Sequence, residues 1–488
     1  MSNKIQFVWR FLDELTLAVI FEKQKTYLKS IKMKKIFLLL LILSCFNLNA
    51  QIKGNNKING KWLVNLSLPD IGVVTTILEI ESEANTYKAF SRKDADKLLL
   101  GKAKAPLMRG MSNFKNGSLI RVEKGEFTEE DDVVKLKGVL VSSMGNYNFI
   151  GEIIKDSINI ALSKKNLKTI GNVIGSRKNV KLPLEDYSKL FAEAINKTRD
   201  KIYRKSLLEE NEWKKFIENM NEIIPDIHDD LEMVSAFYYF GNKLKTSHFA
   251  LLKSLSKDEN NITKKNCVAF EEKSISTGYL KINSFDGSSS EMDSIFKIVI
   301  SKNYKNLIVD LRDNSGGTVE SGMTFANYVF AKPINGGLFL TQKWFNKNNK
   351  IPSLTQYDQF DFFSKSNYEL IINGIHNKEG LYLKVIPNDI NYKGNLFILT
   401  NTKTASTCEP LVYELKTQKR ATIVGTKTAG AMLNAEKFSL LNNFYMYIPT
   451  ADYYTSDGYR IEQNGVLPDI ETKSEEALEK VINELIKN

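Results

Sequence analysis

The chain has 488 residues, of which 42% are hydrophobic and 26% are charged, and this predicts a globular protein of about three domains at roughly 150 residues each. The formal net charge is +11, but residues 1–50 carry eight Lys or Arg against three Asp or Glu, which leaves +6 for the remainder. The other basic residues are scattered and form no stripe interleaved with aromatic residues, which argues against nucleic-acid binding.

The first 50 residues have the pattern of an export signal. A positive segment begins at Met33, the apolar run 36–43 is too short to span a bilayer, and Ala50 suits cleavage by signal peptidase. We expect translation to begin at Met33, so that the residues before it are a spurious extension; an unusually long leader is the alternative. The predicted location is the periplasm or the exterior of the cell, with lipid attachment at Cys45 as a minority alternative.

Beyond the signal, the sequence contains no further stretch of about 18 apolar residues, so we expect no transmembrane helix in the mature chain. Two cysteines remain there, Cys267 and Cys408, which could form one disulfide but not a framework of bridges. The fold is therefore expected to depend on its own hydrophobic core.

Residues 51–175 are predicted to form an antiparallel β domain. Short alternating runs are separated by Gly, Asn and charged turns, and this even spacing is typical of a small barrel or sandwich. The runs cover 61–64, 73–80, 118–122, 133–141, 147–154 and 157–162. The opening Gly60-Lys61-Trp62 is reminiscent of small ligand-binding barrels, and a stabilising accessory domain is an equal alternative.

Residues 182–262 are predicted to form a helical subdomain, because apolar positions follow a helical period from Leu182 to about Leu255. Strands and helices then alternate over 263–475, which is typical of an α/β domain. The expected strands cover 278–282, 306–311, 396–399 and 421–424, and the expected helices cover 289–301 and 321–329. A last amphipathic helix is predicted in 476–488, with a pattern that suits packing on the core or on a partner.

Ser406 lies in a short polar turn between an apolar strand and an amphipathic helix. Such a position holds the hydroxyl on rigid backbone, beside helix N-terminal N–H groups that can stabilise an oxyanion. The same position suits a helix N-cap, which is the better interpretation on local sequence alone. Three other segments of the chain favour a catalytic role for Ser406 over the role of a cap.

The first segment contains one of only three histidines, His248, which follows Thr246 and Ser247. This polar, small-residue context suits a general base. A lone histidine after a helix is nevertheless more often structural. Residues 310–317 read Asp-Leu-Arg-Asp-Asn-Ser-Gly-Gly and follow an apolar strand. Their glycine pair suits an oxyanion hole, or alternatively a plain tight turn. The third segment, 459–469, contains Glu462.

In their order and spacing, these four segments together resemble the C-terminal-processing serine peptidases, also called tail-specific proteases, and within them the tricorn-like branch. The most specific matches are 310–317 and Thr-Ala-Ser-Thr-Cys-Glu at 404–409, followed by Ile-Val-Gly-Thr-Lys-Thr-Ala-Gly at 423–430. The likeness covers roughly 182–470, and the β domain has no counterpart in it. The resemblance implies an α/β catalytic core of the crotonase/ClpP-like type.

The resemblance also implies a role for each matched residue. Ser406 would be the nucleophile and His248 its general base, while Ser247 and Glu462 would complete a Ser-His-Ser-Glu tetrad. This agrees with the chemistry, since a serine hydroxyl is a weak nucleophile that needs a base, and the base needs an orienting partner.

The oxyanion would be held by the N–H of Gly316 or Gly317 and by that of Thr407. The implied reaction is acyl transfer through a Ser406 ester, followed by hydrolysis, with a peptide or unfolded protein as substrate. We expect no cofactor, and no spacing of His, Cys or carboxylates in the sequence indicates a metal site.

Two departures from the family pattern refine this hypothesis. Members that use a Ser-Lys dyad carry the lysine twenty-five residues after the nucleophile, where this chain has Ala431. The nearest lysine, Lys427, comes four positions early, so the histidine route is favoured. Many members also insert a PDZ domain, but only about thirty residues separate His248 from Gly278, too few for one.

The alternative class is a non-catalytic ligand- or peptide-binding protein on the same scaffold, which the unusual Thr407 and Cys408 beside the nucleophile keep open. Geometry separates the two interpretations. The enzyme would be favoured if His248 lies within hydrogen-bond reach of Ser406 and if Glu462 lies close to Ser247.

Overall fold

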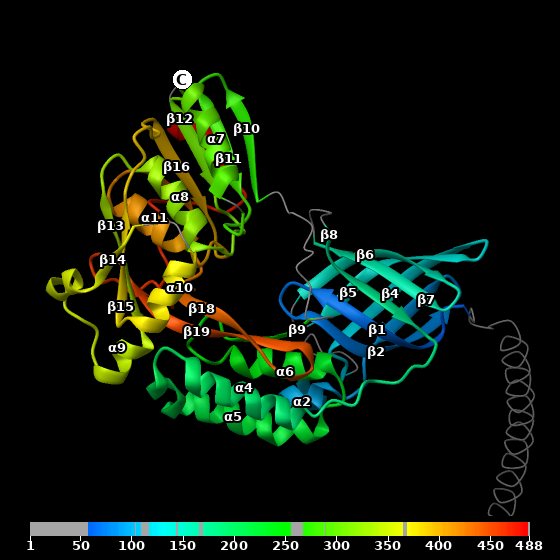
Figure 1. Cartoon of the computed structure of the whole chain (residues 1–488). Helices are drawn as coiled ribbons and strands as arrows, with labels where there is room; N and C mark the ends of the chain where they lie inside the picture. Colours follow the sequence, from blue (N-terminus) through cyan, green and yellow to red (C-terminus); the bar gives the residue numbers. More distant parts are fainter. Residues whose placement is uncertain are drawn as a thin grey trace, which may run out of the picture.

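The structure is a computed structural model, and it describes residues 57–486 apart from 103, 109–116, 143–144, 165–168, 255–266, 288 and 365–367 (Figure 1). The predicted export signal and Cys45 lie outside the described residues. Figure 1 shows a β domain, a layer of helices beside it, and an α/β part that carries the C-terminal residues.

In the described part of the chain, the N-terminal β domain is a closed antiparallel barrel of eight strands. Each strand pairs with the next, and β1 closes the ring by pairing with both β2 and β8. Trp62, Val64 and Leu66 of β1 are buried while their neighbours are not, which is the alternation of a barrel wall. The strands are β1 Gly60–Leu68, β2 Gly72–Glu83, β3 Thr86–Phe90, β4 Ile120–Glu130, β5 Val133–Ser142, β6 Gly145–Ile154, β7 Ser157–Ser163 and β8 Thr169–Ser176, with the short helices α2 Asp96–Leu100 and α3 Ala105–Met108 after β3.

The helical layer lies beside the barrel and beneath the long strands β18 and β19 (Figure 1). It contains α4 Tyr187–Lys201, η2 Lys205–Glu209, α5 Asn211–Ile223, η3 Ile224–Asp226 and α6 Asp230–Gly241. Asp186 and Asp229 cap α4 and α6, since each carboxylate accepts the N–H three residues on. The rings of Trp213 and Phe216 in α5 pack edge to face on Phe249, and the ring of Phe237 in α6 packs on it at a tilt, which gives the layer its core.

The helical region ends earlier than predicted. Ala250–Lys253 forms strand β9, which pairs with Phe444–Tyr447 of β19 (Phe444–Tyr454). Leu251 and Leu252 are both buried there, and a run buried on both faces has no alternation that would distinguish it from a helix in the sequence.

The α/β core is built on a six-stranded sheet in the order β10-β11-β12-β16-β17-β20, within the described residues. All neighbours pair in parallel except the edge strand β10. Its strands are β10 Val268–Ser274, β11 Thr277–Ile282, β12 Asn306–Asp310, β16 Asn395–Thr400, β17 Thr422–Gly425 and β20 Ile470–Glu471. The helices α7 Ser289–Ser301, α8 Val319–Val329 and α11 Cys408–Thr417 share one buried cluster with it.

The predicted C-terminal helix packs on the core. α12 Ala477–Lys480 continues as the turn Val481–Leu485, and Ala477 and Val481 are buried against Phe397 and Val424 of the central sheet. Within the described ranges, no helix is long and apolar enough to cross a membrane. Cys267 and Cys408 are both buried, and no disulfide joins them in the described part of the chain.

Further strands, which the sequence did not predict, continue the sheet of the barrel from β2 through β9 toward the α/β core. β19 pairs with β9 near its start and with β13 at its end, so one long strand reaches from the helical layer to the core (Figure 1). The remaining elements of this region are β13 Ile334–Thr341, α9 Gln342–Lys347, η4 Leu354–Gln359, β14 Asp361–Phe363, α10 Tyr368–Asn377, β15 Gly380–Val385, β18 Leu433–Ser439 and η5 Leu441–Asn443.

Candidate active site

Ser406 lies in the turn between β16 and α11, at the carboxyl end of the parallel sheet, where ligands bind in open α/β sheets. Its φ is +53°, a left-handed conformation that is uncommon for a residue with a side chain and that gathers at functional sites. The N-cap interpretation is wrong, because Thr407 precedes α11 and no side chain caps this helix. The Ser406 N–H donates to Ala431 O at 3.0 Å and to Glu409 Oε2 at 3.2 Å.

Glu462 is fully buried and organises the segment that carries the histidine. Its Oε1 accepts the Ser247 N–H at 2.7 Å, and its Oε2 accepts the Ser247 hydroxyl at 2.8 Å. Oε2 also accepts the Met432 N–H at 2.7 Å. Ser247 Oγ in turn lies 2.7 Å from His248 Nδ1. The structure therefore joins Glu462, Ser247 and His248 in one hydrogen-bonded series.

This series sets the tautomer of the imidazole. An ionised carboxylate can only accept hydrogen bonds, so the single hydroxyl proton of Ser247 points to Glu462. Ser247 Oγ can then only accept from His248, and the Nδ1 atom must carry the proton. The lone pair of Nε2 is left free, which is the state that a general base needs.

His248 and Ser406 are not hydrogen-bonded to each other in the described contacts. Their segments are linked through two neighbouring residues, since Ser406 N–H binds Ala431 O and Met432 N–H binds Glu462. His248 also has a left-handed backbone, with φ at +57°. Burial lowers the pKa of His248, and the nearby Glu462 carboxylate opposes this shift, so the ring favours its neutral form.

The glycine pair approaches Ser406 closely. A Cβ placed on Gly316 would lie 2.6 Å from Ser406 Cβ and 3.1 Å from its Oγ, and φ of Gly316 is +102°. A side chain at this position would therefore overlap Ser406, which explains the need for glycine.

The two N–H groups of the pair differ in availability. Gly316 N–H donates to Asn314 Oδ1 at 2.8 Å, so it is already occupied. Gly317 N–H and Thr407 N–H make no hydrogen bond to any described residue, and Thr407 Oγ1 donates to Gly317 O at 2.7 Å. Of the expected oxyanion donors, the available pair is therefore Gly317 and Thr407.

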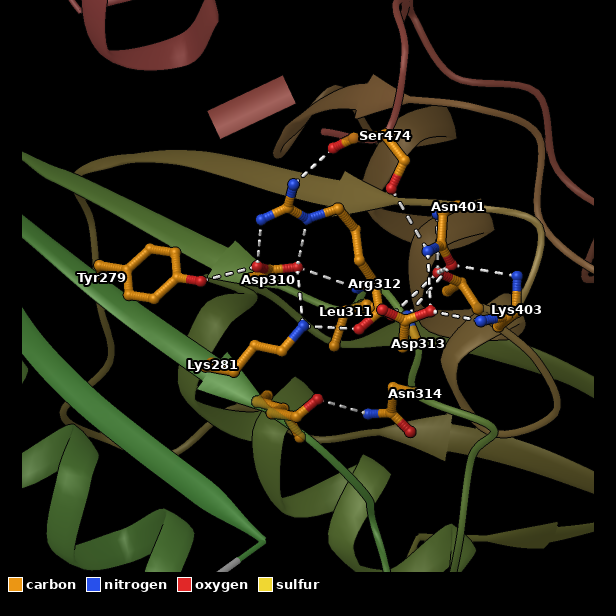
Figure 2. A network of polar contacts seen from close by, with 12 residues as sticks. Tyr279, Lys281, Asp310, Leu311, Arg312, Asp313, Asn314, Asn401, Lys403 and Ser474 are labelled. Atoms are coloured by element: carbon orange, nitrogen blue, oxygen red, sulfur yellow. Dashed lines mark hydrogen bonds and ion pairs between the residues drawn. The ribbon is translucent and has the colours of Figure 1, made fainter. Parts of the chain in front are cut away.

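Asn314 was not singled out from the sequence, yet it ties the two loops of the site together. It is fully buried, and its Nδ2 donates to Ile282 O at 3.0 Å (Figure 2). Its carbonyl accepts the N–H of Ala405, the residue directly before Ser406, at 3.0 Å. The side chain thus fixes the glycine loop, and the main chain fixes the Ser406 turn to that loop.

A buried ionic network supports the start of the same loop (Figure 2). Asp310 accepts from Arg312 Nε at 2.9 Å and Nη2 at 2.6 Å, from Lys281 Nζ at 3.1 Å and from the Tyr279 hydroxyl at 2.7 Å. Burial alone would raise the pKa of Asp310, but Arg312 and Lys281 outweigh it and hold that pKa below its usual value. The carboxylate therefore stays ionised and keeps the loop rigid.

Glu409, in the first turn of α11, is a second organising residue that sequence reasoning missed. Its carboxylate is fully buried and accepts from Thr428 Oγ1 at 2.6 Å, Gly430 N at 2.7 Å and Ala431 N at 2.8 Å, besides Ser406 N. Burial raises its pKa. An acidic residue in the first turn of a helix is too common to signal this role, because only the fold brings the 428–431 loop to it.

The lysine alternative has no support in the geometry. Lys427 is exposed, its Cε atom lies close to Gly465, and no described hydrogen bond joins it to Ser406. The dyad position is occupied by Ala431, whose backbone is bonded to Ser406 and Glu409. Within the described ranges, no group of three or more His, Cys, Asp or Glu side chains is placed to hold a metal ion.

Comparison with known proteins gives a family match that lies in the α/β core. Residues 276–472 match the sequence profile of Peptidase family S41, a range that includes Ser406 and Glu462 but not His248. The chain is 26% identical over 193 residues to carboxyl-terminal-processing peptidase 2, chloroplastic, of Arabidopsis thaliana, which is 39% of this chain and 31% of that protein. It is 23% identical over 193 residues to the carboxyl-terminal-processing protease of Picosynechococcus sp., which is 39% of this chain and 38% of that protein. The chain thus spans about a third of the length of these relatives.

Similar solved structures include a lipoprotein from Streptococcus agalactiae, with a TM-score of 0.43, 17% identity, and coverage of 60% of this chain and 94% of that one. The photosystem II D1 C-terminal processing protease has a TM-score of 0.40 and 15% identity, and the match covers 60% of this chain and 94% of that one. The tricorn protease has a TM-score of 0.40 and 11% identity, and the match covers 83% of this chain and 52% of that one. On the sequence matches, the chain contains a Peptidase family S41 domain and is homologous to the carboxyl-terminal-processing peptidases.

Proposed function

We propose that this chain is an exported serine peptidase that cleaves peptides or unfolded proteins through an acyl-enzyme on Ser406, with His248 as the general base. The observation that carries the proposal is the hydrogen-bonded series from Glu462 through Ser247 to His248 Nδ1, which leaves the Nε2 atom free to take a proton. The family match over 276–472 supports the same reaction class.

In the proposed mechanism, Ser406 Oγ attacks the substrate carbonyl carbon while His248 Nε2 accepts the hydroxyl proton. The N–H groups of Gly317 and Thr407 donate to the oxyanion of the tetrahedral intermediate. When the C–N bond breaks, His248 returns the proton to the leaving amine, and an ester remains on Ser406. A water that His248 deprotonates then hydrolyses this ester and regenerates the enzyme.

The lack of a hydrogen bond between His248 and Ser406 among the described contacts is compatible with this scheme, because catalytic hydrogen bonds are often long before substrate binds. Both residues have left-handed backbone conformations that the surrounding contacts hold in place. We propose that the α/β part has the crotonase/ClpP-like topology and that the chain is exported by the signal in residues 33–50.

Hydrolysis of an unfolded protein tests the proposal. Purified chain is incubated with reduced, alkylated casein, and the products are identified by mass spectrometry. We expect peptides from the parent and from Lys427→Ala, and a loss of roughly 10⁴-fold or more in Ser406→Ala and in His248→Ala.

The lysine variant is the matched control, since it removes the alternative base without touching the tetrad. Equal loss in Lys427→Ala and His248→Ala would reject the histidine route. No cleavage by a folded parent would favour the non-catalytic binding protein.

A further inference from the structure

Strand β18 begins next to the site and has one free edge. Ala431, two residues before the strand, accepts the Ser406 N–H at 3.0 Å, and the Met432 N–H binds Glu462. From there β18 runs alongside β19 (Figure 1), and among the described strands it pairs with β19 alone. The opposite edge of β18 therefore has no partner strand in the described part of the chain.

The hairpin geometry shows which main-chain groups face this edge. Leu440 N–H donates to Phe444 O at 2.8 Å, so these two residues form a hydrogen-bonded pair. In an antiparallel ladder, such pairs alternate with pairs whose N–H and C=O groups point away from the partner strand. Counting back through the register of β18 and β19, the outward-pointing groups belong to Ser439, Lys437 and Ala435.

These outward-pointing groups are unused. The N–H and C=O groups of Ala435, Lys437 and Ser439 make no hydrogen bond to any described residue. Lys437 and Ser439 are exposed, and Ala435 is half-buried. Lys437 Nζ lies 3.9 Å from the centroid of the Tyr445 ring in β19, so its side chain lies over the sheet instead of across the edge. Three donors and three acceptors are therefore open to a further strand.

The free edge lies at a defined distance from the site. A strand rises about 3.3 Å per residue, so Ala435 and Ser439 lie up to about 13 Å and about 27 Å along the chain from Ala431. An extended peptide covers these lengths with four and eight residues. A short peptide bound at Ser406 would not reach the edge, whereas a long unfolded segment would.

We propose that an extended substrate adds to β18 as a further strand, paired with residues 435–439 and four to eight residues from the bond that Ser406 attacks. Strand addition is a recurring way to bind peptides, because main-chain hydrogen bonds supply the affinity. The substrate class is therefore a long unfolded segment and not a short peptide. This inference rests on the proposed peptidase function, because it specifies how the same site binds its substrate.

A proline substitution in β18 tests the edge itself. Because the Lys437 N–H points away from β19, Lys437→Pro removes an outward donor and places a ring at the edge without removing a hydrogen bond of the hairpin. We expect kcat/KM for reduced, alkylated casein to fall at least roughly fivefold. Lys437→Ala is the matched control, since it removes the side chain but keeps the N–H, and it should cleave casein at the parental rate.

A fluorophosphonate carries no peptide and reports on Ser406 alone. Its rate of reaction should be the same in the parent, in Lys437→Pro and in Lys437→Ala, which shows that the variants are folded and their serine is activated. Casein cleavage by Lys437→Pro at the parental rate would overturn the inference and leave the peptidase proposal intact. A folded parent that cleaves no casein would overturn both proposals.

Methylation of substrate amides tests the same contact on the parent protein, and it decides the question if Lys437→Pro does not fold. A synthetic peptide of about 24 residues, long enough to reach the edge on either side, is centred on a bond that the parent cleaves in casein. One amide at a time is N-methylated. Because the N–H groups of a strand face its partner at every second residue, kcat/KM should fall at alternate positions four to eight residues from that bond, on one side of it. Equal rates for all peptides methylated in this range would overturn the inference.

A second copy of the chain is the alternative occupant of the edge. Light scattering after size-exclusion chromatography gives the mass of the parent and of Lys437→Pro in solution. We expect the same mass for both. A parent dimer that Lys437→Pro converts to a monomer would assign the edge to a second copy and overturn the inference.

Discussion

At the scale of single residues, the site depends on which atoms are already bonded and which are free. Glu462 uses both oxygens to hold Ser247, so that His248 keeps its Nε2 lone pair for the substrate side. Gly316 N–H is occupied by Asn314, so the proposed oxyanion donors are Gly317 and Thr407. These assignments make the direction of each hydrogen bond testable.

Replacing Glu462 by glutamine should reverse the proton order in the series. The amide can donate to Ser247 Oγ, which would then donate to His248 Nδ1 and move the ring proton to Nε2. We expect the rate of Ser406 acylation to fall by roughly 10²–10⁴-fold with little change in substrate affinity. Rates of peptide hydrolysis and thermal unfolding, compared with the parent, check the prediction. A variant that keeps the parental rate would show that Glu462 has only a structural role.

The pH dependence of acylation should report His248. Only the neutral imidazole can accept the serine proton, and burial holds the pKa of His248 below 6.5. The rate should therefore rise with pH, reach half its maximum below pH 6.5, and be level from pH 7 upward. Measurement of fluorophosphonate reaction rates from pH 5 to 9 checks this. A midpoint above pH 7 would contradict the assignment of a buried, neutral histidine as the base.

At the scale of elements, two loops at the carboxyl ends of β12 and β16 form the site, and each depends on buried polar groups from the other. Asn314 binds the turn before Ser406, and Glu409 binds the turn and the 428–431 loop. The Asp310 network fixes the start of the glycine loop (Figure 2). Loops this short keep a strained serine in place only because these bonds over-determine their conformation.

A methyl group on Gly316 should remove the nucleophile from its position. The added Cβ would meet Ser406 Cβ at 2.6 Å, in a backbone conformation that alanine rarely adopts. We expect Gly316→Ala to lower the rate of fluorophosphonate reaction by at least roughly 10²-fold.

Gly241→Ala is the control for this substitution. Gly241 ends α6 and has no positive φ, and a methyl group added to it would meet no atom within 4 Å. It should leave the rate unchanged. If the two variants behaved alike, the close approach of Gly316 to Ser406 would have no role in the reaction.

Sequence reasoning reached most of the α/β core because its elements are defined by local pattern. The helix expected at 289–301 is α7, and the strand expected at 306–311 is β12. Glu409 and Asn314 lie within the two most specific matched segments, but the sequence assigned them no role, because their partners are brought to them only by the tertiary fold. The antiparallel strands β13, β15 and β19 were missed for the same reason, since buried pairing with distant segments leaves no local periodicity.

At the scale of the whole molecule, a buried ion cluster joins the barrel to the layer that carries the histidine. Lys253 of β9 binds Asp230 at 2.9 Å and Glu185 at 3.0 Å, and Asp230 also accepts the N–H of Thr75 in barrel strand β2. His248 lies between α6, which begins at Asp230, and β9, which ends at Lys253. The cluster therefore joins the two elements that flank the histidine to each other and to the barrel.

Replacing Lys253 by methionine should leave two buried carboxylates without their cation. We expect the free energy of unfolding to fall by roughly 3–5 kcal/mol, the cost of breaking a buried ion pair from one side. Urea denaturation, monitored by tryptophan fluorescence, measures the change. Lys137→Met is the control, since Lys137 pairs with Glu126 on the exposed barrel surface and its loss should have little effect. Similar losses in both variants would show that the cluster contributes nothing special to the interface.

The most direct test of the account is to map the site that a fluorophosphonate modifies. The purified chain, Ser406→Ala and His248→Ala are treated with the probe, digested, and analysed by mass spectrometry. The account predicts one adduct on Ser406 in the parent, none in Ser406→Ala, and a strongly reduced yield in His248→Ala. A folded parent that forms no adduct, or an adduct that persists in Ser406→Ala, would contradict it.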